Sequence, residues 1–324
     1  MDLGVMIEGQ EGLSWDLWRR VATSVEELGF ESLWRSDHFF SLSGPRNQEA
    51  VETYLSFAIA AEITNSVRFG ALVSPITFRH PSLLARMCAQ IDALSGGRFV
   101  AGVGAGWNVP EHEAFGIPFP PVGERMDRLD ESIRVMRALW SDGPASFSGK
   151  YYQLREAECY PKPVQQPLPV MVGGGGERRT LRIVAELADE WNAVGVDLDG
   201  YRRKREVLER HCEKVGRDPA SIRHSQMSGF IVGKDDSGVR NHLRLIGERL
   251  GHDAVVGSMT ADPGQVLEAA RFRGWLVGTP SEVVDELGRR EEAGVSRLML
   301  QHHANDNFEV LELLAAEVLP QIQK

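Results

Sequence analysis

Short apolar segments alternate with amphipathic segments along the whole chain, and this alternation limits the possible folds more than any other feature. Apolar residues recur at helical spacing in Trp15–Leu28 and in Met126–Trp140, between runs with the length of strands. Repeated strand–helix units predict a parallel sheet, and eight strands close a barrel. We therefore predict an α/β fold, a (β/α)8 TIM barrel, with an open doubly wound sheet as the alternative. The expected strands are Leu3–Ile7, Ser32–Arg35, Val67–Val73, Phe99–Gly102, Pro169–Val172, Glu190–Val194, Ser225–Val232 and Arg297–Leu300.

Two segments interrupt the alternation. Residues 142–167 contain turn residues, prolines and the pair Tyr151-Tyr152, which predicts a hairpin and loop inserted before the fifth strand. Residues 234–274 are rich in charge, glycine and helical pattern, and we expect this second insertion after the seventh strand, on the C-terminal face of the barrel. No low-complexity segment or linker divides the chain, so we expect residues 1–324 to form a single domain.

Composition excludes several classes of function. The chain has 324 residues, of which 42% are hydrophobic and 25% charged, enough to bury a large core. A formal net charge of -10 argues against a nucleic-acid partner. No apolar run approaches the ~20 residues of a membrane span, and Met1–Gly4 does not start a signal peptide. Cys88, Cys159 and Cys212 are isolated, so we expect neither disulfides nor a zinc site, in a cytoplasmic protein without a membrane partner.

Four consecutive glycines, Gly173, Gly174, Gly175 and Gly176, separate the fifth expected strand from a helical pattern that begins near Glu177. A strand that ends in glycines before a helix leaves backbone N–H groups unpaired, and the helix dipole adds positive charge. The segment therefore predicts a phosphate site, with Arg178 or Arg179 as a bidentate contact. A flexible linker is the alternative, but glycine linkers seldom begin on a buried strand.

Neither glycine-rich segment matches a known nucleotide fingerprint. The third glycine of G-x-G-x-x-G would fall at Arg178 or Arg179 in the first segment. In the second segment, which starts at Gly102, Trp107 and Val109 occupy the corresponding positions. Neither segment ends in Gly-Lys followed by Ser or Thr, as a P-loop does. We therefore expect a phosphate that is held in another way.

The best acid–base candidates are Asp37 and His38, directly after the second expected strand. Active sites of TIM barrels lie at the C-terminal ends of the strands. A histidine exchanges protons near neutral pH, and a neighbouring carboxylate biases its pKa, so we expect Asp37 and His38 to act together. The alternative is a histidine that only caps a loop.

Other residues at strand ends carry weaker predictions. Glu8 is either a ligand contact or a solvated carboxylate, and Trp107 either stacks on a ring or covers the barrel. His302 and His303 are adjacent, so their side chains point to opposite faces of a strand. Because H-E-x-x-H is also missing, we expect no metal site. G-x-S-x-G is absent, which argues against a nucleophile elbow.

Five segments together resemble the luciferase-like monooxygenase superfamily: SLWRSDHFF, ALVSPITFRHP, GVGAGWNVPEHEAFGIPFPP, the four glycines and WLVGTPSEVVDEL. They span nearly the whole chain in order, and they are most similar to the branch that uses the deazaflavin coenzyme F420. The resemblance implies a barrel whose mouth binds a flavin or a deazaflavin, and a homodimer.

The resemblance also assigns residues. It places the cofactor ring against the third strand, where the family often has a non-proline cis peptide, here mapped to Leu72–Val73. The cofactor phosphate would contact Gly174–Gly176 and Arg178, and Glu8 and His303 are weaker candidates for substrate contacts. The remaining cofactor contacts implied are Asp37, His38, Ser74, Gly106, Trp107, Asn108 and Gly173.

One position departs from the family pattern. Some deazaflavin enzymes that oxidise sugar phosphates carry a glutamate acid on the loop after the fourth strand. Aligned on G-x-G, Trp107 occupies that position here, so we do not expect sugar-phosphate dehydrogenase activity. Glu111 and His112 lie nearby as candidate substitutes.

The resemblance and the residues together predict an oxidoreductase. We expect hydride transfer between coenzyme F420 and a small organic substrate, with His38 supplying or accepting the proton. The alternative is a flavin monooxygenase that uses reduced FMN and oxygen. A third interpretation is a cofactor-binding protein without catalytic activity. The identity of the substrate is not encoded in any motif, because variable loops line such pockets.

Overall fold

Eight parallel strands form a closed barrel in the computed structural model, which describes residues 1–250 and 262–322. The sheet closes because β9 pairs with β10, and β12 pairs with β1. The barrel prediction is confirmed, and the open sheet is wrong. The barrel strands are β1 (Asp2–Ile7), β2 (Ser32–Arg35), β3 (Arg68–Ala71), β5 (Phe99–Gly104), β8 (Val170–Gly173), β9 (Glu190–Val194), β10 (Arg223–Val232) and β12 (Arg297–His302).

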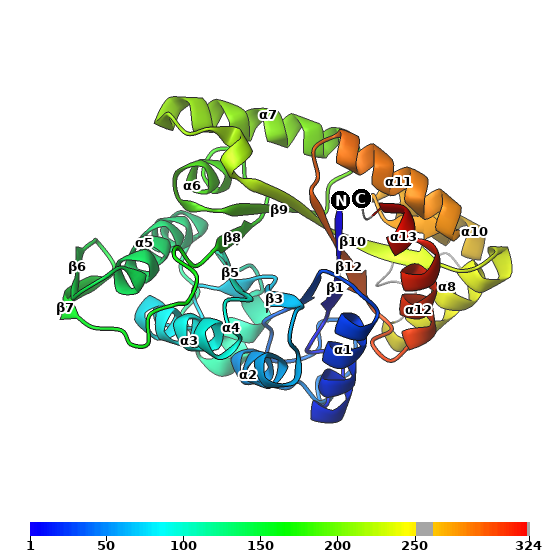
Figure 1. The fold of residues 1–324 in the computed structure, drawn as a ribbon, viewed down its shortest axis with the longest axis horizontal. Coiled ribbons are helices and arrows are strands. Elements are labelled where there is room, and N and C mark those ends of the chain that lie inside the picture. The colour runs from blue at the N-terminus through cyan, green and yellow to red at the C-terminus, as the bar shows by residue number, and fades with distance from the viewer. Residues whose placement is uncertain (251–261, 323–324) are drawn as a thin grey trace.

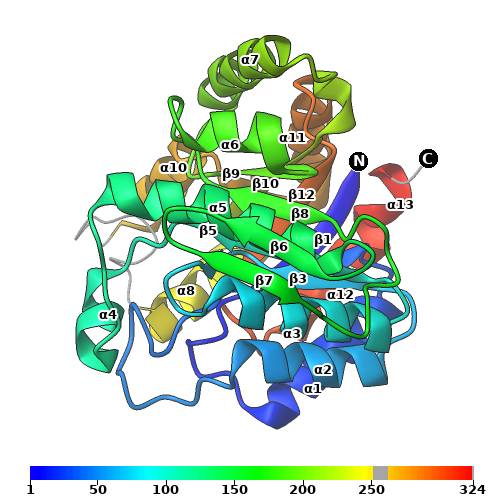
Figure 2. The same cartoon turned by 90° about the vertical axis from the view of Figure 1, so that its left-hand side faces the viewer.

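Helices surround the strands on all sides, as Figures 1 and 2 show. None of the helices within residues 1–250 and 262–322 combines the length and apolar character needed to cross a membrane. The helices are α1 (Trp15–Glu27), α2 (Thr53–Ile63), α3 (Pro81–Leu94), α4 (Val109–Phe115), α5 (Val122–Trp140), α6 (Thr180–Leu187), α7 (Leu198–Val215), the 3-10 turn η1 (Pro219–Ser221), α8 (Asp236–Leu250), α10 (Pro263–Phe272), α11 (Pro280–Glu292), α12 (Phe308–Glu317) and α13 (Leu319–Ile322).

The alternation of side chains along each strand separates two apolar regions. On β1, Val5 and Ile7 belong to the core between sheet and helices, whereas Met6 belongs to a smaller cluster inside the barrel. Flexible methionines fill irregular interior space well. The interior cluster consists of Met6, Trp34, Leu72, Val100, Met171 and Met299, with Val73 and Met227 packed against it.

The third strand is interrupted, contrary to the expectation of a continuous strand over Val67–Val73. β3 ends at Ala71, the Leu72–Val73 peptide is cis, and pairing resumes in β4 (Ser74–Pro75). β4 pairs with Val103 and Gly104 at the end of β5. Side chains before and after the interruption therefore do not alternate between the two faces of the sheet as they would along one continuous strand.

Both expected insertions contain the elements predicted for them. The first holds an antiparallel hairpin, β6 (Ala145–Ser148) and β7 (Gln153–Ala157), which lies outside the barrel beside α5 (Figures 1 and 2). The second holds α8 and α10, whose apolar faces pack in a separate cluster with Ile231 and Val277. Directly after this insertion, strand β11 (Leu276–Gly278) extends the sheet beside β10. Residues 251–261 of this insertion lie outside the described residues.

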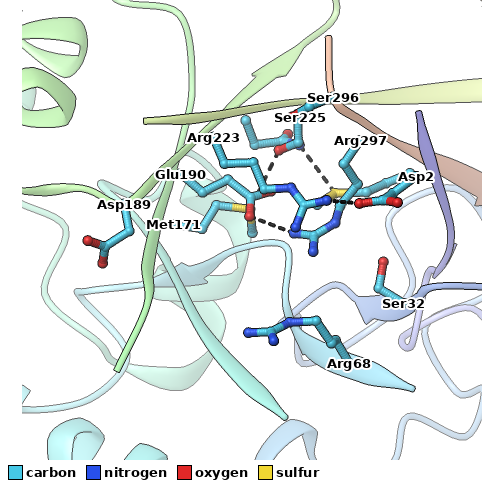
Figure 3. A network of polar contacts seen from close by, with 12 residues as sticks. Asp2, Ser32, Arg68, Met171, Asp189, Glu190, Arg223, Ser225, Ser296 and Arg297 are labelled. Carbon is cyan, nitrogen blue, oxygen red and sulfur yellow. Dashed lines mark hydrogen bonds and ion pairs between the residues drawn. The ribbon is translucent and has the colours of Figure 1, made fainter. Parts of the chain in front are cut away.

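A network of charged groups closes the N-terminal end of the barrel (Figure 3). Arg297, at the start of β12, donates to Glu190 at 2.6 Å and to both carboxylate oxygens of Glu31 at 2.6 and 2.9 Å. Arg223 pairs with Asp2 beside it. Burial raises the pKa of Glu31, but the charge and hydrogen bonds of Arg297 outweigh it and lower that pKa overall. These ion pairs link the N-terminal ends of the barrel strands to one another.

Candidate cofactor and substrate site

A cavity of about 580 Å³ lies at the opposite, C-terminal end of the barrel. Active sites of this fold occupy that end. The cavity brings together nine of the residues predicted from the sequence, from the ends of six different strands or the loops that follow them. They are Glu8, His38, Leu72, Val73, Gly106, Trp107, Gly173, Gly174 and His303.

His38 is held in this cavity by Glu111, which lies on the first turn of α4. The Nδ1 atom of His38 lies 2.7 Å from Oε2 of Glu111, and the other oxygen accepts from the backbone N–H of Phe39 at 2.6 Å. Burial lowers the pKa of His38, but the hydrogen bond and charge of Glu111 outweigh it, so this pKa is raised. With Nδ1 facing a carboxylate, Nε2 is the nitrogen left for a ligand.

Asp37 is not the partner of His38, and the expectation of an Asp37–His38 pair is wrong. The Asp37 carboxylate accepts from the hydroxyl of Ser74 at 2.7 Å and from Arg79 at 2.5 and 3.2 Å. Burial raises the pKa of Asp37, but Arg79 and the hydrogen bonds lower it overall. Adjacent residues at a strand end point to opposite sides, so Asp37 faces the neighbouring strand while His38 faces the cavity. Asp37 therefore fixes the start of β4.

Neither Ser74 nor Asn108 lines the cavity, contrary to their expected cofactor contacts. The Ser74 hydroxyl is shared between Asp37 and the Tyr54 hydroxyl, 2.9 Å away. Asn108 is buried at the start of α4, where its carbonyl lies 2.6 Å from Nδ1 of His112. His112 is in turn bound to Thr77, 2.7 Å from its Nε2, so it is not available as a substitute acid.

Val73 lies between two glycines from neighbouring strands. A Cβ added to Gly104 would come within 2.7 Å of a Val73 methyl, and one added to Gly173 within 2.9 Å. Only glycine fits at these positions without moving Val73. Gly104 and Gly173 therefore add no side chain to the cavity wall beside Leu72 and Val73, which suits a flat ring.

The glycine segment continues from this wall toward the surface. Gly173 is the last residue of β8, and α6 begins only at Thr180, so the helix starts later than the sequence suggested. The backbone N–H groups of Gly175 and Gly176 make no hydrogen bond within the described part of the chain. Arg178 is exposed and has no ion pair there, whereas Arg179 is paired with Asp127. Of the two predicted arginines, Arg178 is therefore the one without an ion pair to the described part of the chain.

A second cavity, of about 650 Å³, adjoins the first. The two share Val194, Met227, Trp275 and Gln301 as a common wall. The second cavity contains three cations, Arg203, Lys204 and Arg273, beside the carboxylates Glu177 and Asp197. Lys204 donates to the carbonyl of Gly175 at 2.7 Å, which connects this cavity to the glycine segment. The cations thus lie beside the predicted phosphate site.

Comparison with known proteins decides the family. A sequence model of luciferase-like monooxygenases matches residues 1–297. The chain belongs to the luciferase-like monooxygenase family. The expected resemblance is confirmed, and the cavity described above is the mouth of a luciferase-like barrel.

Relatives within this family use different cofactors. An F420-dependent glucose-6-phosphate dehydrogenase from Amycolatopsis mediterranei is 29% identical, over 93% of each chain. An FMNH(2)-dependent dimethylsulfone monooxygenase from Pseudomonas putida is 25% identical, over 97% of this chain and 90% of its own. In fold, the chain is similar to an F420-dependent secondary alcohol dehydrogenase in complex with an F420-acetone adduct. That structure has a TM-score of 0.84 and 23% identity, over 100% of this chain and 99% of its own.

Several residues around the two cavities were not predicted from the sequence. Trp275 forms part of the shared wall, and Glu11 lines the first cavity. Arg203 and Arg273 come from α7 and from the end of the second insertion, where no motif marks them. Within residues 1–250 and 262–322, no group of three or more His, Cys, Asp or Glu side chains is placed to hold a metal ion.

Proposed function

We propose that the protein binds coenzyme F420 in the first cavity and transfers a hydride between this coenzyme and a small organic substrate. The observation that carries the proposal is the flat wall of Leu72, Val73, Gly104 and Gly173, which faces the same cavity as His38. A planar ring on this wall would lie within the reach of a residue that exchanges protons. The family and its F420-dependent relatives support the same function.

The surroundings of the wall suit the rest of the coenzyme. The unpaired N–H groups of Gly175 and Gly176, with Arg178, are suitable donors for a phosphate. F420 also carries an acidic tail, which FMN lacks. Arg203 and Arg273 in the adjoining cavity have no hydrogen bond or ion pair through their side chains within the described residues, and suit such a tail. This is the feature that favours F420 over FMN.

When bound, the deazaflavin ring supplies the carbon that gives or takes the hydride. The protein's part is to hold the substrate carbon near the ring and to move a proton. Nδ1 of His38 is oriented by Glu111, so Nε2 gives or takes the proton of the substrate oxygen. Glu111 acts as a positioning residue, because it is fully buried and touches His38 rather than the cavity.

A binding titration tests this proposal. F420 and FMN, oxidised and reduced, are titrated into the protein and followed by fluorescence. We expect F420 to bind more tightly than either form of FMN. Tight binding of FMN with no response to F420 would contradict the proposal and favour a flavin monooxygenase.

We further propose that the protein is a cytoplasmic homodimer forming a single-domain barrel. The resemblance to the family supports the dimer. Cys88, Cys159 and Cys212 are buried free thiols, which suits a reducing compartment. Light scattering after gel filtration measures the oligomeric state, and a monomeric mass at micromolar concentration would contradict the dimer.

A further inference from the structure

Among the described residues, carboxylates but no Lys or Arg side chains line the first cavity. Glu8 and Glu11 line it, and none of its lining residues within the described chain is Lys or Arg. The sequence of residues 251–261, GHDAVVGSMTA, contains neither Lys nor Arg. An anionic group that entered this cavity would lose water without gaining an Arg or Lys partner, and it would be repelled by two carboxylates.

Both carboxylates are already hydrogen-bonded by uncharged groups. Glu8 accepts from the side-chain amides of Gln301 at 2.5 Å and Gln10 at 2.8 Å. Glu11 accepts from the Ser41 hydroxyl at 2.6 Å and from the backbone N–H of Leu42 at 2.8 Å. Each carboxylate oxygen therefore already has one uncharged donor. These neutral donors hold the two carboxylates in place, and their negative charges disfavour an anion in the cavity.

His303 supplies the groups that an uncharged substrate needs. Its ring stacks on Trp275, with centroids 5.2 Å apart and planes at 19°. Both ring nitrogens are buried, and neither has a hydrogen-bond partner within the described residues. Burial lowers the pKa of His303 despite the opposing charges of Glu8 and Glu11, so the imidazole is neutral. A neutral imidazole offers one donor and one acceptor, the pair that a hydroxyl or a carbonyl compound can use.

The cations that could compensate an anion lie in the second cavity, beside the glycine segment. Arg203, Lys204 and Arg273 are separated from His38 and His303 by the shared wall that contains Trp275 and Gln301. The cations of the second cavity suit the anionic tail of the coenzyme, and the first cavity, which has carboxylates instead, suits an uncharged group.

From this division, we propose that the substrate of this protein is an uncharged alcohol or carbonyl compound that hydrogen-bonds to His303 and His38, and that phosphorylated compounds are excluded. The inference rests on the proposed use of F420. In the oxidative direction the carbinol C–H bond breaks and its electron pair leaves with hydrogen as hydride to oxidised F420. The O–H proton is transferred to Nε2 of His38. The products are the carbonyl compound and reduced F420. His38 and the coenzyme then exchange protons with water, so the protein returns to its starting state.

Matched pairs of ligands test the proposal. Alcohols and their phosphate esters, including glucose and glucose 6-phosphate, are titrated by calorimetry into the F420-loaded protein, and turnover is measured for the same pairs. We expect the neutral member to bind at least about tenfold more tightly than its phosphate ester. Equal or tighter binding of the esters, or binding of no neutral member, would overturn the inference. Failure of F420 itself to bind, measured separately by fluorescence, would instead overturn the proposed function.

Two charge-neutralising variants show where the selectivity arises. Glu8→Gln removes a charge from the first cavity, and Glu62→Gln removes an equal charge from the exposed surface of α2. We expect Glu8→Gln to reduce the preference for the neutral ligand several-fold and Glu62→Gln to leave it unchanged. If both variants keep the wild-type preference, the carboxylates of the first cavity do not exclude anions and the inference fails.

Discussion

The guanidinium of Arg297 at the N-terminal end of the barrel and the ring nitrogens of His303 at its C-terminal end are all buried, but only the guanidinium has hydrogen-bond partners within the described residues. At the N-terminal end, Arg297 is buried and each of its guanidinium nitrogens donates to a carboxylate of Glu31 or Glu190. At the C-terminal end, both ring nitrogens of His303 are buried and have no hydrogen-bond partner within the described residues. Buried polar groups are normally satisfied, so groups left open in a cavity are candidates for ligand binding. The base of the barrel holds the fold together, and its mouth is open for ligands.

The largest effect is expected at the mouth, from His38→Ala. Loss of the proton-exchanging group should lower turnover about 10²- to 10⁴-fold. The affinity for F420, measured by fluorescence, should stay within a few-fold of wild type, because the wall of Val73 and the glycines is intact. Turnover close to that of wild type would remove His38 from the reaction.

At the base, Arg297→Leu should reduce the free energy of unfolding by about 3–5 kcal/mol, because it leaves Glu190 buried without a counter-charge. Urea denaturation measures the loss. Arg289→Leu, on the exposed side of α11, is the control and should unfold close to wild type. If Arg297→Leu were as stable as this control, the network in Figure 3 would not stabilise the base.

The cations of the second cavity should distinguish the coenzymes. Arg203→Ala combined with Arg273→Ala should weaken F420 binding about tenfold, and less so at high salt, because surface charge pairs are screened. FMN binding should change little. Arg202→Ala is the matched control, since Arg202 neighbours Arg203 but is paired with Asp199 at 3.0 Å. An equal loss of F420 affinity in Arg202→Ala would show that the loss does not depend on the two arginines that line the second cavity.

The smallest effect is a shift in pH dependence from Glu111→Gln. The pKa of His38 is raised by Glu111, and alcohol oxidation requires the unprotonated ring, so the rate should increase as pH rises through that pKa. Removing the carboxylate lowers the pKa, and the rising limb of kcat should move to lower pH. A limb that stayed in place would show that Glu111 does not set the protonation of His38.

The barrel could be predicted from the sequence because the patterns that indicate strands and helices are local. Strand and helix periodicity is present in each segment, and the four glycines mark the end of the fifth strand without reference to the rest of the chain. His38 was found because it follows a strand. Its partner was missed, since Glu111 lies 73 residues away on α4, while the adjacent Asp37 faces Arg79.

The orientation of individual side chains could not be predicted near the interrupted strand. The break at Leu72–Val73 disturbs the alternation, so Ser74 faces Asp37 rather than the cavity. Arg273 reaches the second cavity from the end of the second insertion, and Arg203 reaches it from α7. Such residues carry no local signal, because their position depends on contacts between distant parts of the chain.

The affinity of the Gly173→Val variant for F420 is the most direct test of whether the coenzyme binds at the mouth of the barrel. Valine at this position would displace Val73 from the flat wall. Gly288→Val is the matched control, because a side chain there meets nothing within 4 Å. With melting temperatures measured alongside, we expect Gly173→Val to weaken F420 binding about tenfold or more and the control to bind as wild type does. Wild-type affinity in a folded Gly173→Val protein would contradict the account.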